Sequence, residues 1–176
     1  FEHQIAMPEV PEAESLPDEF VQRAKFMKDA PEHVQKMMMR PRPIEMRGVD
    51  GDAFFSDGPR EARSAVWFRA RAPIGDDAHM HQVILAYASD MNMLSTAMRP
   101  HRVHWDTPGL QSASLDHAMW FHKPSNFNDW HLYSQDSPSA SGGRGFVRGS
   151  IYDQAGVLVA SVTQEGLIRM RKAGEA

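Results

Sequence analysis

A carboxylate stands where the surrounding residues predict the apolar side of a helix. Asp90 follows Val83 by seven residues and Tyr87 by three in DDAHMHQVILAYASDM (76–91). On a helix this spacing continues the apolar stripe, where a carboxylate needs a hydrogen-bonding partner or neutralisation. In the alternative interpretation the helix ends near Ser89, and Asp90 is a solvated turn residue.

An amide occupies a similar position in the last predicted strand. Gln164 lies in VLVASVTQEGLIR (157–169), on one face with Leu158, Ala160, Val162 and Ile168. An amide in that row offers two donors and an acceptor to a buried group. A hydrogen bond to a neighbouring loop backbone is the simpler alternative.

The segment SASLDHAMWFH (112–122) combines strand character with reactive residue types. Strict alternation would place Ser114 and Asp116 on one face and His117 on the other. A serine on a strand is usually a surface residue, so Ser114 carries no functional weight by itself.

Other chemistries lack the residues that they need. The chain has no cysteine, which excludes disulfides, thiolate metal sites and a cysteine nucleophile. Neither His79 with His81 nor His117 with His122 can share a metal from one helix or strand, because each pair points to opposite sides. There is no G-x-S-x-G nucleophile motif, and SGGRG (141–145) lacks the Lys-Ser/Thr of a phosphate loop. We therefore predict no metal and no cofactor.

The elements that must position these residues are mainly strands. Alternation and turn residues predict strands at 43–49, 65–72, 111–122, 130–137, 144–153 and 157–169, with turns at 141–145 and 153–156. One helix is predicted at 76–91, with an apolar stripe of Met80, Val83, Ile84, Tyr87, Ala88 and Met91. This order predicts an α+β fold, an antiparallel sheet with one long helix covering a face.

The first 42 residues have linker composition, since proline and acidic residues alternate there. A short helix is predicted at 15–30, with Ser15 as N-cap and with Phe20, Ala24 and Met27 as its apolar stripe. A further turn or two is predicted at 30–39, using Val34, Met37 and Met38. We expect these short helices to pack across a larger body.

The bulk properties of the chain fit a globular protein of one domain plus a linker. It has 176 residues, 41% of them hydrophobic, and a net charge of −4. This charge favours neither nucleic acid nor an anionic membrane as a partner. The sequence shows no apolar run long enough to span a bilayer, no secretory signal and no Ser-Lys-Leu ending, so we expect a cytoplasmic location.

Four segments together resemble a known family. HQVILAYASDMNML, SASLDHAMWFH, SPSASGGRGFVRG and LVASVTQEGLIR closely resemble the C-terminal half of the type II acyl-CoA thioesterases, the TesB-like, double-hotdog enzymes. The similarity covers about residues 40–170, and FEHQIAMPEVPE resembles the exit from that family's first hotdog unit. The resemblance implies an inter-domain linker at 1–42, a C-terminal hotdog domain at 43–172, in which an antiparallel sheet wraps around a central helix, and a tail at 173–176. It also implies that most of the N-terminal hotdog is absent.

The resemblance implies a catalytic trio of Asp90, Ser114 and Gln164. Asp90 and Ser114 would hydrogen-bond a water, with Asp90 as its base, and Gln164 would hold that water in line with a thioester carbonyl. Asp116 and His117 also belong to the family pattern, and we interpret them as structural.

The implied substrate is a medium-to-long-chain fatty acyl-CoA. Arg99, Arg144 and Arg148 are candidate partners for the phosphates of the coenzyme, although each also fits a solvated surface role. Because hotdog sites form where two units meet, the resemblance implies a partner: a second copy of the chain or a separate hotdog unit.

Two rival functions remain open. Hotdog hydratases and dehydratases use Asp and His five residues apart near the helix start, and Asp76 and His81 have this spacing. However, Asp77–Met80 replaces the Asn-Pro expected between them. The other rival is a subunit that binds acyl-CoA without turnover.

Overall fold

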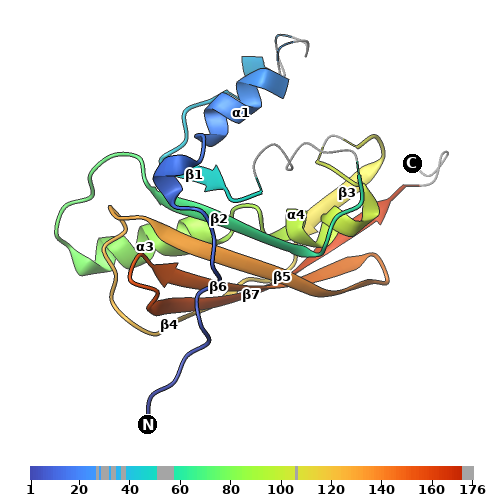
Figure 1. The fold of residues 1–176 in the computed structure, drawn as a ribbon. Helices are drawn as coiled ribbons and strands as arrows, with labels where there is room; N and C mark the ends of the chain where they lie inside the picture. The colour runs from blue at the N-terminus through green and yellow to red at the C-terminus, as the bar shows by residue number, and fades with distance from the viewer. Residues whose placement is uncertain are drawn as a thin grey trace.

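A single antiparallel sheet forms the centre of the computed structural model (Figure 1). The structure describes residues 1–26, 28, 32, 35–36, 39–50, 58–105 and 107–171. The strands are β1 (Ile44–Gly48), β2 (Arg63–Ala70), β3 (Leu110–Ser114), β4 (Ala118–Phe121), β5 (His131–Ser141), β6 (Arg144–Asp153) and β7 (Leu158–Met170). Their order is β1-β2-β5-β6-β7-β3, and β4 also pairs with β7. The predicted α+β class and antiparallel sheet are confirmed, and the predicted strand at 111–122 is in fact two strands.

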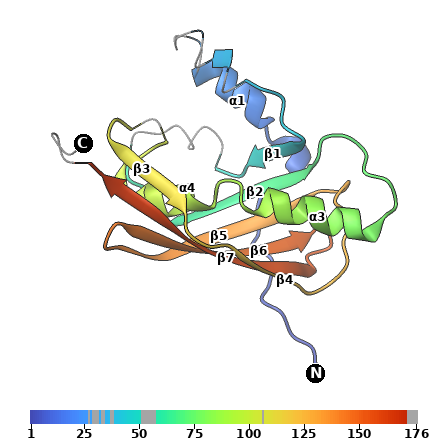
Figure 2. The ribbon, with the colours of Figure 1, turned by 180° about the vertical axis from the view of Figure 1, so that it is seen from behind.

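Two helices lie against one face of this sheet (Figure 2). They are α3 (Ala78–Ser89) and α4 (Met93–Met98), followed by the 3₁₀-helix η3 (Arg99–His101). Asn92 separates them, with a left-handed φ of 66°, a conformation in which a helix cannot continue. The sequence prediction missed α4 because this break gives no periodicity signal. No helix in the described part of the chain has the length and apolarity needed to cross a membrane.

The short helix α4 approaches the sheet closely at glycine positions. Leu94 and Ala97 of α4 are buried. A Cβ at Gly166 would lie 2.3 Å from Leu94, and one at Gly145 would lie 2.7 Å from Ala97. Glycine on β6 and β7 therefore lets the helix pack directly on the backbone of the sheet.

The main core lies between the sheet and these helices. Phe68 stacks on Tyr133 with ring centroids 5.3 Å apart, and Leu85 and Ala88 of α3 join the same cluster. The predicted apolar stripe of α3 is only partly right, since Ala88 is buried and Ile84 partly buried. Three of its members are largely exposed: Met80, Val83 and Tyr87.

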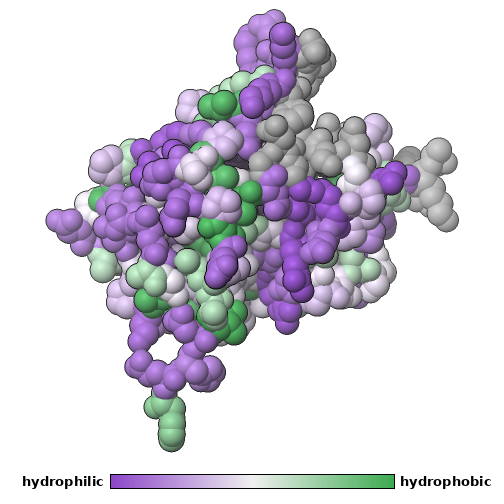
Figure 3. Space-filling view, in the orientation of Figure 1, coloured by the Kyte–Doolittle hydropathy of each residue, from purple (hydrophilic) through white to green (hydrophobic). Residues whose placement is uncertain are grey.

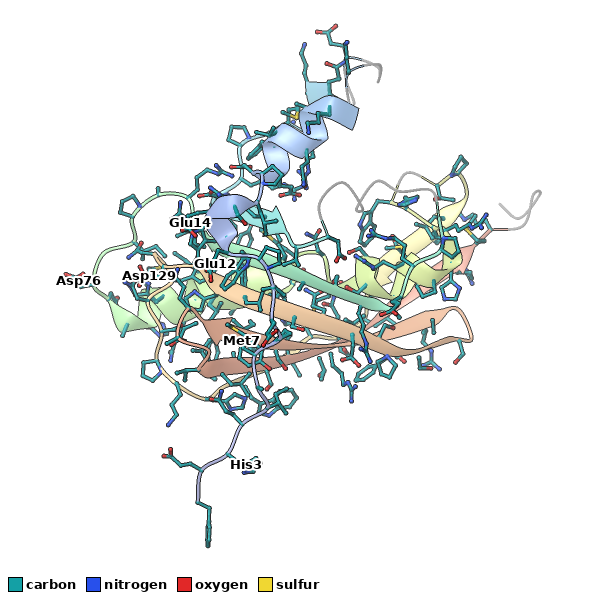
Figure 4. The ribbon with its side chains drawn as sticks, in the orientation of Figure 1. His3, Met7, Glu12, Glu14, Asp76 and Asp129 are labelled. Carbon is teal, nitrogen blue, oxygen red and sulfur yellow. The ribbon has the colours of Figure 1, made fainter. Side chains whose placement is uncertain are left out.

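The N-terminal segment crosses the opposite face of the sheet (Figures 1 and 4). Trp67 Nε1 donates to the carbonyl of Pro11 at 2.9 Å, and Arg47 donates to the carbonyls of Ala13 and Leu16. Met7 lies over the sheet in Figure 4, where a second apolar cluster forms around Trp67. In Figure 3 this face shows apolar residues between broad hydrophilic areas. This segment precedes the short helices that the sequence predicts to pack across a larger body, and its packing is not part of that expectation.

The helix α1 (Glu19–Phe26) begins later than predicted. Asp18 Oδ1 accepts from the backbone N–H of Phe20, whereas the predicted cap, Ser15, lies in the 3₁₀-helix η1 (Ala13–Ser15). Its buried residues are polar, Gln22 and Arg23, whereas of the predicted stripe Phe20 is half-buried, Ala24 is exposed and Met27 lies outside the described residues. The further turns predicted at 30–39 rest on Val34, Met37 and Met38, which lie outside the described residues.

Candidate active site

Three polar side chains converge at one end of α3. Gln164 Nε2 lies 2.9 Å from Asp90 Oδ1 and 2.5 Å from Ser114 Oγ. They come from three elements far apart in the sequence: the end of α3, the end of β3 and the middle of β7. The structure thus brings together the three residues predicted as a catalytic trio.

Asp90 is the residue that ends α3, and its side chain is 59% exposed. The interpretation in which the helix ends near Ser89 is therefore correct. The backbone is fixed by the preceding turn, because Tyr133 Oη donates to the carbonyl of Ser89 at 2.9 Å. Asp90 is thus both solvated and hydrogen-bonded, a combination suited to a carboxylate that must exchange protons with water.

Burial raises the pKa of the Tyr133 hydroxyl well above its usual value, and the nearby Asp90 carboxylate acts in the same direction. Tyr133 therefore stays neutral and keeps donating to the end of α3 at ordinary pH.

A β-bulge places Ser114 beside Gln164. Ser114 pairs with Gly166 and Ala118 pairs with Thr163, so that three residues (115–117) oppose two (164–165). Such an extra residue re-aims the side chains around it. Asp116 Oδ1 accepts from the backbone N–H of Glu165 at 2.7 Å, which ties the bulge to β7. The interpretation of Asp116 as structural agrees with this contact.

The bulge also corrects the predicted faces of this segment. Strict alternation placed Ser114 and His117 on opposite sides, yet both contact Gln164. His117 Nδ1 lies 3.2 Å from Gln164 Oε1, and its Nε2 lies 2.8 Å from Ser89 Oγ. A single sequence carries no pairing information, so the extra residue could not be seen in the pattern.

Gln164 is the buried member of the site, with 1% of its surface exposed. Its amide has two N–H groups, and its contacts with Asp90 and Ser114 use both. Its carbonyl oxygen faces His117. The alternative of a hydrogen bond to a loop backbone is not what the structure shows.

The three candidate arginines pair with carboxylates other than Asp90. Arg99 lies 2.5 Å from Asp50, Arg144 lies 3.4 Å from Glu165, and Arg148 lies 2.5 Å from Asp136. The hydrogen bonds that Arg148 donates to Asp136 raise the pKa of its guanidinium, which is cationic in any case. Each of these arginines thus has a carboxylate partner outside the trio.

The residues of the rival hydratase interpretation are used differently. His81 is buried, and its Nδ1 accepts from the backbone N–H of Phe127 at 3.1 Å. Asp76 is exposed in the loop before α3, at the edge of the molecule in Figure 4. His81 is thus committed to holding the loop before β5.

Comparisons with known proteins point to one family. Residues 50–167 match the acyl-CoA thioesterase family. The chain is 37% identical over 169 residues to acyl-CoA thioesterase 2 of Haemophilus influenzae, covering 96% of this chain and 59% of that protein. It therefore spans little more than half the length of that relative.

Solved structures show the same relationship. The crystal structure of an acyl-CoA thioesterase II from Mycobacterium marinum superposes with a TM-score of 0.74 at 37% identity, covering 99% of this chain and 59% of that one. A protein with a hotdog fold from Alicyclobacillus acidocaldarius superposes with a TM-score of 0.66 at 18% identity, covering 98% of this chain and 58% of that one, which supports the hotdog architecture. The chain therefore belongs to the acyl-CoA thioesterase family, with the hotdog fold of its type II members.

Proposed function

We propose that this chain is the catalytic hotdog unit of an acyl-CoA thioesterase that attacks its substrate directly with water. The observation that carries the proposal is the contact of Gln164 with both Asp90 and Ser114, made by residues from three elements. Membership of the acyl-CoA thioesterase family supplies the reaction class.

The proposed reaction needs one base and two orienting groups. Asp90 takes a proton from a water while the water oxygen forms a bond to the thioester carbonyl carbon. The resulting tetrahedral intermediate collapses, the carbon–sulfur bond breaks, and the coenzyme A thiolate takes the proton from Asp90. Ser114 and Gln164 orient the water, and because Gln164 donates to Ser114 Oγ, the hydroxyl proton of Ser114 is free to point elsewhere.

The proposed substrate is a medium-to-long-chain fatty acyl-CoA, whose phosphates are anionic. The side chains of Arg144 and Arg148 are each 57% exposed, so water already competes for their ion pairs. A phosphate would compete in the same way. Arg99 is only 16% exposed, which makes it the weakest of the three candidates. A cytoplasmic location stays a prediction.

We also propose that a second hotdog unit completes the site. Large apolar side chains are exposed on α3, in the bulge and on the edge strand β4: Met80, Val83 and Tyr87, then Leu115, then Trp120 and Phe121. An exposed apolar surface of this kind, next to an open catalytic carboxylate, fits a covering partner. A second copy of the chain or the other half of a double-hotdog enzyme would supply it.

A non-catalytic subunit that binds acyl-CoA is the second candidate function. The exposure of Asp90 favours it, because in a lone chain nothing excludes bulk water from the base. By contrast, the contact of His81 with the backbone counts against the hydratase alternative.

The test is release of free thiol from a medium-to-long-chain acyl-CoA. Asp90→Asn keeps the shape of the site but removes the base, so turnover should fall by about 10²–10⁴-fold. Asp76→Asn is the matched control, since it changes an exposed aspartate in the loop before α3 and should leave turnover intact.

The assay is run on the chain alone and on the chain joined to the N-terminal half of a type II relative. Equal turnover in Asp90→Asn and the unsubstituted protein would refute the assignment of the base. Acyl-CoA binding without turnover in both forms would establish the non-catalytic subunit instead.

A further inference from the structure

We propose that His117 is a positioning residue that holds the Gln164 amide in its working orientation, an inference that rests on the proposed function. His117 lies inside the β-bulge between β3 and β4. Its ring bridges the end of α3 and the middle of β7, since Nε2 contacts Ser89 Oγ at 2.8 Å and Nδ1 contacts Gln164 Oε1 at 3.2 Å.

Hydrogen-bond accounting fixes which way the amide faces. A carboxylate only accepts, so the group that Gln164 turns toward Asp90 must be its NH₂, as the 2.9 Å contact requires. The second N–H of that NH₂ is used on Ser114. The carbonyl oxygen is left on the opposite side, where only a donor can stabilise it.

His117 supplies that donor if Nδ1 carries a proton. Gln164 Oε1 cannot donate, so the 3.2 Å contact is a hydrogen bond only in the Nδ1–H form of the ring. With the amide reversed, two acceptors would face each other at Asp90 and two donors at His117. The ring therefore selects the orientation that lets Gln164 donate toward Asp90 and Ser114.

The ring is itself held by a buried residue. Ser89 has no exposed surface, and its Oγ lies 2.7 Å from the carbonyl of Ala86 as well as 2.8 Å from the ring. Because the one hydroxyl proton of Ser89 is donated to the carbonyl of Ala86, Ser89 Oγ accepts from the ring, and Nε2–H is the donor in that contact. Because Ser89 directly precedes Asp90, one ring connects the residue beside the base to the amide that orients the water.

A purely structural role for His117 would be to join the bulge to α3 through Ser89. Two substitutions separate the roles, because each keeps one contact. The amide nitrogen of asparagine is two bonds from Cβ, as Nδ1 is, so His117→Asn keeps a donor for Gln164. The amide nitrogen of glutamine is three bonds from Cβ, as Nε2 is, so His117→Gln keeps a group beside Ser89.

The expected result is that His117→Gln lowers kcat by about tenfold or more with little change in KM, whereas His117→Asn stays within about threefold of the unsubstituted enzyme. Thermal unfolding of both variants checks that each is folded. Retained activity in His117→Gln together with loss in His117→Asn would overturn the proposal.

A double substitution tests whether His117 acts through Gln164. In a Gln164→Ala background, adding His117→Gln should cause no further loss of kcat, because the amide to be positioned is already gone. Independent, multiplied losses would contradict the proposal and favour a structural role.

A measurement without substrate keeps this inference separate from the proposed function. Nitrogen-15 NMR of the histidine rings reports which nitrogen is protonated, and we expect a proton on Nδ1 of His117. A bare Nδ1 would refute the positioning role even in an active enzyme. An inactive protein whose Nδ1 is protonated would instead count against the thioesterase assignment, with the hydrogen bond to Gln164 confirmed.

Discussion

Ser114 is the member of the site whose role can be tested with the least disturbance to the fold, because it is exposed at the end of β3. Ser114→Ala removes a hydroxyl that orients water, so kcat should fall by about ten- to a hundredfold while the unfolding temperature stays unchanged. Ser114→Thr keeps the hydroxyl and should keep most of the activity. Steady-state kinetics measures kcat of these variants, with Ser112→Ala as a control on the same strand. Full activity in Ser114→Ala would exclude Ser114 from the site.

At this scale the sequence pattern was informative only where a residue type disagreed with its neighbours. Gln164 stood out in an apolar row, and it is buried as that row suggests. Ser114 did not stand out, since its proposed role depends on its contact with Gln164, which lies 50 residues away in the chain. The trio was predicted by family resemblance, whereas the contact between His117 and Gln164 required the geometry of the bulge.

The contact between α4 and β7 should be sensitive to one methyl group. At Gly166 a Cβ would lie 2.3 Å from the side chain of Leu94, which is only 3% exposed. Gly166→Ala should therefore destabilise the protein by about 1–3 kcal/mol through overpacking. The control is Gly48→Ala on β1, where a Cβ meets no atom within 4 Å and the change should be small. Denaturant unfolding measures both, and equal stability of the two variants would contradict the close packing of α4.

Helices and strands with regular periodicity were predicted well, whereas the breaks and bulges that interrupt them were not. The predicted strand at 144–153 coincides with β6, and the predicted turn before it has a positive φ at Gly142 and Gly143. The end of α3 near Ser89 was one of two alternatives, whereas the left-handed Asn92 and the bulge at 115–117 were missed, because they depend on contacts between distant segments. These interruptions are what place Asp90, Ser114 and His117 around Gln164.

On the scale of the whole molecule, the sheet has one face packed against helices and an open edge at β4. The helices α3 and α4 lie against one face, and the N-terminal segment crosses part of the other (Figures 1 and 2). Alternation predicted the antiparallel sheet, whereas proline-rich composition predicted only a linker with short helices. The β4 edge pairs only with β7 among the described strands, and its Trp120 is 53% exposed. An open strand edge with apolar side chains favours association with another strand.

We therefore expect the purified chain to sediment as a dimer or a larger species. Trp120→Glu places a charge on the β4 edge and should weaken association by about tenfold or more, since a carboxylate buried in an apolar contact has no partner. Val21→Glu is the matched control, because Val21 is also 53% exposed but lies on α1. Sedimentation velocity over a range of concentrations distinguishes the two variants. A chain that stays monomeric at high concentration, or a Trp120→Glu variant that associates as tightly as Val21→Glu, would show that the β4 edge is not where a partner binds.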